Sequence, residues 1–353
     1  MPPPAARARA RASAPSSRTH SLADSPDRST TASGPPRVVA IGGGTGLSTL
    51  LRGLREQAAS GEIAALTGIV TVADDGGSSG RLRRDFGVLP PGDIRNCLAA
   101  LADEEDLLTR LFQYRFDAGE GLAGHPFGNL FLTALTDLTG DFSQAILAAE
   151  RILSVRGRIL PSTLADVRLR ARGASGRWHE GESAVGRAGE PIQRLALVPA
   201  SAPAFPAALT ALAEADLIVL GPGSLYTSLL PNLLIDGLRT ALARRQAPAV
   251  LPLNLMTQPG ETDGLDAVGH LAALERHAGK GLIDLVLVHG GEIPESRLAA
   301  YRATGAEPVV VARRALERRG VAVVEADLLA PGDLLVRHDP ARLAAAVLAC
   351  RRC

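Results

Sequence analysis

The segment from Val38 to Leu51 constrains the fold of this chain more than any other. A short β-branched run ends at Gly42-Gly43-Gly44-Thr45-Gly46, and apolar residues then recur at helical spacing. A chain that turns this sharply from strand to helix needs residues without a Cβ atom. The turn also aims free backbone N–H groups and a helix N-terminus at one place. We therefore predict that this loop binds a phosphate or another small anion, although an unliganded glycine turn is the simpler alternative.

A second glycine loop in the same context strengthens this prediction. The buried-strand signal of residues 216–220 leads into Gly221-Pro222-Gly223-Ser224, and Pro231 then favours the start of a helix. The hydroxyl groups of Ser224, Thr227 and Ser228 suit phosphate oxygens. Because the carboxyl ends of parallel strands lie along one edge of a sheet, we expect the two loops to face one crevice.

Strand and helix signals alternate over about 300 residues. This alternation predicts an α/β fold, a Rossmann-like doubly wound and mainly parallel sheet with helices on both faces. The predicted strands are residues 38–41, 66–72, 216–220, 249–253, 283–289, 308–311 and 321–325, and a closing helix starts at Pro340.

The domain organisation follows from composition. Residues 1–36 are rich in Pro, Ala, Ser and Arg and hold hardly any large apolar residue, so we expect a disordered tail. We predict that residues 37–353 form a single domain. Within it, residues 158–198 combine short alternating pieces with Gly, Ser and charged residues, which indicates a small β-rich insertion.

Bulk composition excludes several classes of function. The formal net charge is +1 and aromatic residues make up 3% of the chain, which argues against nucleic-acid binding by base stacking. No apolar run approaches the roughly 20 residues that span a bilayer, so membrane insertion is not expected. Three cysteines cannot form a disulfide framework, which suits a reducing cytoplasm.

A loop rich in charged and hydroxyl groups follows the second predicted strand. Asp74 and Asp75 stand at the carboxyl end of that strand and are suited to Mg²⁺ or a ribose hydroxyl. Ser78, Ser79 and Arg81 are suited to phosphate. The alternative is a long solvated loop of turn-forming residues, but its place at a strand end favours a function.

Two further motifs precede helices. Asp93, in the segment from Pro90 to Leu98, is predicted to be a helix N-cap. His125 precedes another helix and suits either a structural hydrogen bond or acid–base chemistry. The first glycine loop is not a Walker loop, because no Gly-Lys-Ser/Thr follows it. It is not a dinucleotide fingerprint either, because the third glycine would fall at Leu47, which excludes a nicotinamide dehydrogenase.

Taken together, these stretches resemble the YvcK-type gluconeogenesis factors, within the CofD-like superfamily of 2-phospho-lactate transferases. The resemblance covers almost the whole chain beyond residue 36, and Pro126 departs from it, since the family usually has Ser after the histidine. The matching segments are residues 41–51, 70–83, 90–98, 125–132, 221–232 and 254–264.

The resemblance implies a cytoplasmic protein that binds a UDP-sugar, UDP-N-acetylglucosamine or UDP-glucose, and forms a homo-oligomer. It also implies a part in cell shape and in the supply of envelope precursors on gluconeogenic carbon. The ligand-binding residues would be Gly42, Gly43, Gly44, Thr45, Gly46, Asp74, Asp75, Ser78, Ser79, Arg81, Asp93, Arg95, Asn96, His125, Asn129, Gly221, Gly223, Ser224, Thr227, Ser228, Asn232, Asn254, Thr257, Gln258, Glu261 and Thr262.

Two hypotheses remain. The first is a UDP-sugar-binding regulator without turnover. The second is a Mg²⁺-dependent transferase that uses a nucleotide-activated donor, with Asp74 and Asp75 near the metal. The first is favoured because no general base is paired with an obvious nucleophile, and because the first glycine loop resembles that of the regulators. The transferases tend to continue with Gly-Gly-Ala-Lys.

Overall fold

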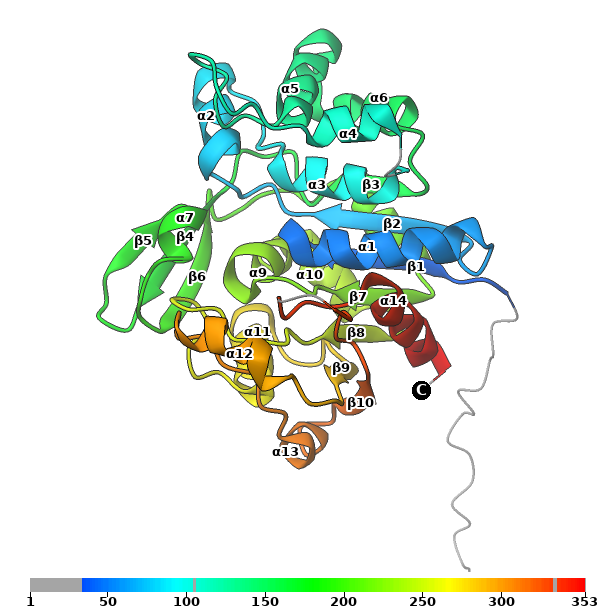
Figure 1. Ribbon diagram of the computed structural model, residues 1–353, viewed down its shortest axis with the longest axis vertical. Coiled ribbons are helices and arrows are strands. Elements are labelled where there is room, and N and C mark those ends of the chain that lie inside the picture. The colour runs from blue at the N-terminus through cyan, green and yellow to red at the C-terminus, as the bar shows by residue number, and fades with distance from the viewer. Residues whose placement is uncertain (1–33, 104–105, 333–334, 353) are drawn as a thin grey trace, which may run out of the picture. The chain divides into compact units, whose positions relative to one another are not determined.

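A seven-stranded parallel sheet forms the centre of the protein (Figure 1). The computed structural model describes residues 34–103, 106–332 and 335–352, so the predicted tail of residues 1–36 lies almost wholly outside the described residues. The predicted doubly wound α/β fold is confirmed. In spatial order the strands are β10 (Ala322–Ala326), β9 (Leu285–His289), β8 (Ala249–Pro252), β7 (Leu217–Leu220), β1 (Arg37–Gly42), β2 (Ala65–Val70) and β3 (Arg158–Pro161).

Helices cover both faces of this sheet. One group packs around α1 and the other around α9 and α11. Helices α2, α4, α5 and α6 gather beyond the β2–β3 edge, in the upper part of Figure 1. The helices are α1 (Gly44–Ala59), α2 (Gly77–Phe86), α3 (Gly92–Leu101), α4 (Leu107–Gln113), α5 (Phe127–Thr139), α6 (Phe142–Ile152), α8 (Pro206–Glu214), a π-helical turn η1 (Leu225–Leu229), α9 (Leu230–Leu233), α10 (Asp236–Ala243), α11 (Ala267–Ala278), α12 (Glu295–Arg302), α13 (Arg313–Glu317), α14 (Pro340–Ala349) and the 3₁₀ turn η2 (Cys350–Arg352).

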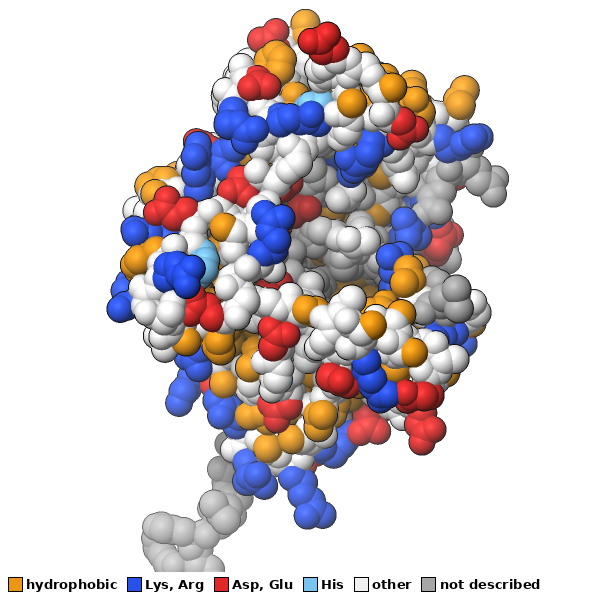
Figure 2. All heavy atoms as spheres, turned by 60° about the vertical axis from the view of Figure 1, so that its left-hand side comes forward, with side chains coloured by type: hydrophobic (Ala, Val, Ile, Leu, Met, Phe, Trp, Pro, Cys, Tyr) orange, Lys and Arg blue, Asp and Glu red, His pale blue; other side chains and the backbone are white. Residues whose placement is uncertain are grey.

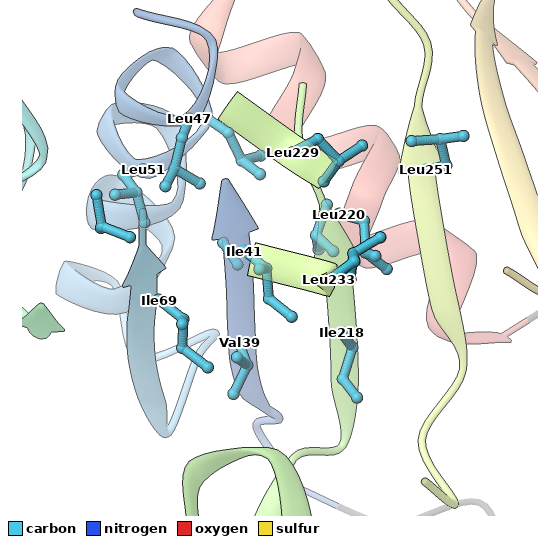
Figure 3. Packing of buried hydrophobic residues seen from close by; sticks show 14 of the residues in the cluster. Val39, Ile41, Leu47, Leu51, Ile69, Ile218, Leu220, Leu229, Leu233 and Leu251 are labelled. Atoms are coloured by element: carbon cyan, nitrogen blue, oxygen red, sulfur yellow. The ribbon is translucent and has the colours of Figure 1, made fainter. Parts of the chain in front are cut away.

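The central strands are continuous runs of apolar residues. Helices cover both faces of this parallel sheet, so neither face of a central strand is exposed to solvent. Figure 3 shows Ile41, Ile69 and Leu220 of adjacent strands together with Leu47 and Leu51 of α1, and all five are fully buried. The core is built from Leu, Val, Ile and Ala, as the low aromatic content requires.

The strand order reverses between β1 and β7. From β1 the chain proceeds through β2 to β3 on one side, and from β7 through β8 and β9 to β10 on the other. Open α/β sheets bind ligands in the crevice outside the carboxyl ends of the strands at such a switch point. The two glycine loops follow β1 and β7, so both lie at this place.

A three-stranded antiparallel sheet stands apart from the main sheet. It consists of β4 (Arg168–Gly173), β5 (Trp178–Glu180) and β6 (Ile192–Val198) in the order β5-β4-β6, with α7 (Glu182–Val185) between β5 and β6. The β-rich insertion predicted for residues 158–198 differs from this at its start. Residues 158–161 form β3, which pairs in parallel with β2, because Ile159 and Leu160 are apolar and buried like the other central strands.

Two further expectations differ from the structure. The predicted strand at residues 308–311 is wrong, because this segment crosses the loop after β8, where the Val309 N–H donates to the Leu255 carbonyl. Helix α1 begins at Gly44 rather than after Gly46, so most of the first glycine loop belongs to its first turn. In the part of the chain that the structure describes, no helix combines the length and apolar character needed to cross a bilayer.

Candidate functional site

The two glycine loops touch each other directly. The Gly221 N–H donates to the Ile41 carbonyl at 2.7 Å, which ties the end of β7 to the end of β1. A Cβ atom on Gly46 would lie only 2.4 Å from the Pro222 carbonyl oxygen. Glycine is therefore needed at position 46 because the second loop occupies the space of a side chain. The predicted shared crevice is thus present in the geometry.

A cleft of about 610 Å³ opens beside the joined loops. It lies within the size range of small-molecule sites. The face drawn in Figure 2 is hollowed near its centre, with a floor of mostly white atoms and with blue and red side chains around the rim. The lining comprises Gly43, Gly44, Thr45, Gly46, Thr49, Gly186, Pro222, Gly223, Ser224, Ser228, residues 254–259, Glu261, Tyr301, Thr304, Ala306, Val336, Arg337 and His338.

The loop after β8 holds the second glycine loop in place. Asn254 accepts a hydrogen bond from the Gly223 N–H at 3.2 Å and donates to the Gly223 carbonyl at 2.8 Å. These two hydrogen bonds fix the peptide planes on either side of Gly223, whose φ of 151° favours glycine. Asn254 therefore shapes the cleft as well as lining it.

The Glu261 carboxylate accepts hydrogen bonds at the start of η1, the helical turn that follows the second glycine loop. It accepts from the Tyr226 N–H at 2.7 Å and from the Ser224 hydroxyl. Ser224 in turn accepts from the Thr227 N–H at 3.0 Å. Burial raises the pKa of Glu261, and these hydrogen bonds oppose the rise. A protein carboxylate therefore already occupies this helix end.

Asp93 reaches the first glycine loop from α3. Its carboxylate accepts a hydrogen bond from the Gly44 N–H, and a Cβ atom on Gly43 would lie 2.5 Å from Asp93 Oδ2. Burial and the nearby Asp74 raise the pKa of Asp93 to about 7. The predicted N-cap role is wrong, because the α3 N-cap is Pro91 and Asp93 lies in the first turn. Its side chain is instead directed to the loop after β1.

An acidic cluster adjoins Asp93. Asp74 accepts from the Gly76 N–H at 2.8 Å, and Asp75 accepts from the Ser183 N–H of α7 at 3.2 Å. Burial and repulsion from Asp74 raise the pKa of Glu182, also in α7, to about 10. Sequence reasoning missed Glu182 because it lies in the insertion, over 100 residues from Asp74. Over the described residues, no group of three His, Cys, Asp or Glu side chains is placed to hold a metal ion.

Several predicted phosphate ligands bond to the protein itself. The Ser78 hydroxyl lies 2.7 Å from His125 Nδ1 and accepts from the Asn129 amide at 3.0 Å. Ser79 accepts from the Gly92 N–H at 3.1 Å, and Arg81 donates to the Ala123 carbonyl at 2.9 Å. Partial burial and the charge of Arg81 lower the pKa of His125. These contacts join α2 to the start of α5 and to α3.

The remaining predicted residues divide between the cleft and the interior. Thr257 and Gln258 line the cleft. Asn232 is fully buried and donates to the Gly42 carbonyl at 3.1 Å, and buried Thr262 accepts from the Gln258 N–H. Arg95 donates to Asn96 at 2.6 Å, and burial lowers the pKa of Arg95 to about 10.

Arg337 is the lining residue that sequence reasoning most clearly missed. It is an exposed cation at the edge of a cleft lined mainly by uncharged groups and backbone. It follows β10 by about ten residues, in a stretch with no glycine loop or hydroxyl cluster to single it out. Its neighbour His338 is half-buried, and desolvation of the imidazole lowers its pKa to about 4 and leaves it neutral at pH 7.

Comparisons with known proteins agree on one family. Residues 38–329 match the family model described as 2-phospho-L-lactate transferase CofD. A putative gluconeogenesis factor from Nostoc sp. is 54% identical over 89% of this chain and 68% of its own length. The gluconeogenesis factor of Bacillus subtilis is 44% identical over 88% of this chain and 96% of its own. A crystal structure of a UPF0052 family member from Bacillus halodurans is 44% identical with a TM-score of 0.84, over 88% of this chain and 99% of that one.

Proposed function

Because this chain belongs to the gluconeogenesis factor family, within the wider CofD family, we propose that it is a cytoplasmic UDP-sugar-binding regulator. Its ligand would be UDP-N-acetylglucosamine or UDP-glucose. Its role would be to support cell shape and the supply of envelope precursors during growth on gluconeogenic carbon.

The observation that carries this proposal is the pair of joined glycine loops beside one cleft at the switch point. The first turn of α1 places the backbone of Gly44, Thr45 and Gly46 at the cleft. Asp93 engages the Gly44 N–H, and the N–H groups of Thr45 and Gly46 suit a diphosphate at this helix N-terminus. Arg337 supplies a positive charge at the edge. The cleft volume of about 610 Å³ is of the size that a nucleotide-sugar requires.

The lining chemistry favours binding over turnover. The Ser224 hydroxyl is engaged by Glu261 and by the Thr227 N–H, and Glu261 also accepts from the Tyr226 N–H. These groups are fixed in local hydrogen bonds and shape the site. His338 is held neutral, but its Nε2 is buried away from the cleft surface.

The test is a ligand panel of UDP-N-acetylglucosamine, UDP-glucose, GDP and NAD, read by both melting temperature and product formation. A UDP-sugar at about 100 times its Kd stabilises the folded state by about 2.7 kcal/mol, a rise of several degrees. GDP and NAD should give smaller shifts, and no ligand should be consumed. Equal shifts with all four ligands, or none with the UDP-sugars, would reject the proposal.

A Mg²⁺-dependent transferase is the second candidate, favoured by the match to the CofD model and by the acidic cluster. Mg²⁺ prefers carboxylate oxygens, and burial together with repulsion from Asp74 raises the pKa values of Asp93 and Glu182. Asp74 and Asp93 would hold the ion, which would neutralise a donor phosphate. Sustained Mg²⁺-dependent turnover of any nucleotide-linked donor would establish this candidate in place of the regulator.

A further inference from the structure

The outer face of the small insertion sheet carries a cluster of arginines, here termed the arginine face. Along β4, Leu169 and Ala171 are buried, so the alternating Arg168, Arg170 and Arg172 lie on the opposite side of the sheet. The register adds Arg194 of β6 beside Arg172, with Trp178 and Glu180 of β5 completing the face. Four guanidinium groups thus share a surface with one carboxylate.

This charge is not balanced within the face. Arg170 pairs with Glu180 at 3.2 Å, but in the described part of the chain neither Arg168 nor Arg194 forms an ion pair. Arg172 and Arg194 stand directly opposite each other across β4 and β6. Like charges in directly opposed positions destabilise a sheet. The chain as a whole carries a net charge of only +1, so the cluster is a local excess of positive charge.

The surroundings of Trp178 favour a protein partner for the arginine face over a nucleic acid. The Arg170 guanidinium carbon lies 4.2 Å from the centre of the indole ring and covers one face of it. That face is closed to a stacking nucleobase, which single-stranded nucleic acids use on such platforms. The arginines that remain open present planar forks, which match carboxylates in a bidentate geometry.

We propose that the arginine face binds an extended acidic segment of a partner protein, with carboxylates at every second residue. Alternate residues of any β-strand recur about every 6.6–6.8 Å, so the carboxylates of such a segment repeat in step with the arginines of β4. Carboxylates four residues apart meet the open Arg168 and Arg172, and the one between them faces Arg170, which Glu180 and Trp178 already engage. Charge complementarity and the matched repeat together specify this partner. The inference is independent of what the cleft binds.

The test uses a ten-residue peptide of four Glu and six Thr with Glu at alternating positions 2, 4, 6 and 8. A second peptide of the same composition has Glu at every third position, 1, 4, 7 and 10, so that no two of its carboxylates stand two or four residues apart on one face. The single tryptophan, Trp178, is 37% exposed on this face and reports binding by fluorescence. The full chain is compared with the triple variant R168Q/R172Q/R194Q. The control variant R110Q/R244Q/R318Q removes the same charge from exposed positions in α4 and directly after α10 and α13.

The alternating peptide should bind more tightly than the peptide with Glu at every third position, and its affinity should fall as salt is raised. The triple variant should bind it about tenfold more weakly, as expected for the loss of three exposed ion pairs, and the control variant should match the parent. Equal affinity for the two peptides, equal loss in both variants, or no binding would overturn the proposal. Tighter binding of a ten-nucleotide oligouridylate, lost in the triple variant, would assign the face to nucleic acid instead.

Discussion

Replacement of Gly46 by alanine tests whether the contact between the two glycine loops makes the ligand site. The new methyl group would lie 2.4 Å from the Pro222 carbonyl oxygen and 2.8 Å from the Gly223 Cα. Both are backbone atoms, so no side chain can rotate away. The loops must therefore separate by about 1 Å to regain an ordinary van der Waals distance.

Two opposing effects set the change in stability. Overpacking costs about 1–3 kcal/mol. Because Gly46 lies in the first turn of α1, alanine returns up to about 1 kcal/mol of helix propensity. With the full propensity gain subtracted, a net loss of about 0–2 kcal/mol lowers the melting temperature of the free protein by at most a few degrees. The protein should therefore remain folded while the cleft is distorted.

The assay is the melting shift produced by UDP-N-acetylglucosamine at a fixed concentration. At about 100 times the parent Kd the ligand contributes about 2.7 kcal/mol, and a tenfold weaker Kd reduces this to about 1.4 kcal/mol. The shift should fall to about half or less. Gly42→Ala is the matched control, because its Cβ would meet Leu47 Cβ at 3.5 Å and Gly221 Cα at 3.7 Å, both ordinary contacts. A folded Gly46→Ala protein with the full parent shift would refute the joined-loop site.

Three other substitutions probe the site and its surroundings. Arg337→Gln should weaken UDP-sugar binding by about 1.5–3 kcal/mol, the value of a hydrogen bond to a charged group, with an unchanged melting temperature for the free protein; calorimetric titration measures both. Asn254→Ala leaves the Gly223 peptide without partners and should cost about 1–3 kcal/mol in urea unfolding, together with a loss of ligand affinity. Glu182 has a raised pKa of about 10 against 4.5 for the free group, so the folded state keeps a proton that the unfolded chain has released, and stability falls as the pH rises between these values. In urea unfolding between pH 7 and pH 9, the free energy of unfolding should fall by up to about 1.4 kcal/mol per pH unit, and Glu182→Gln should abolish this fall. An equal fall in both proteins would contradict a protonated Glu182 in the folded state.

Local pattern was sufficient for six of the seven strands of the main sheet, all except β3, and for the two glycine loops. The runs at residues 38–41 and 217–220 are continuously apolar because each of these strands is covered on both faces. The glycines after them mark the sharp turns. The alternation of strand and helix then specified a parallel sheet, and hence that the turns lie at one edge.

Predictions from local sequence pattern were wrong where contacts between distant parts of the chain determine the structure. Residues 308–311 are as apolar as a strand, yet they cross the loop after β8, because neighbouring backbone and not composition selects the pairing. Asp93 has the sequence context of an N-cap, but in the fold its carboxylate is within reach of the Gly44 N–H. Ser78 and His125 lie 47 residues apart and hydrogen-bond to each other, a pairing that no local pattern signalled.

By itself, the sequence determined the strand–turn–helix units, because burial and the absence of a Cβ atom act within a few residues of the chain. It also determined the family. Only the tertiary structure decided which of the polar groups meet. It joined Gly46 to Pro222, brought Glu182 of the insertion to Asp74, and set Arg337 at the edge of the cleft. These residues are separated by more than 100 positions, and their proximity depends on strand order and helix packing, for which no local residue pattern carries a signal.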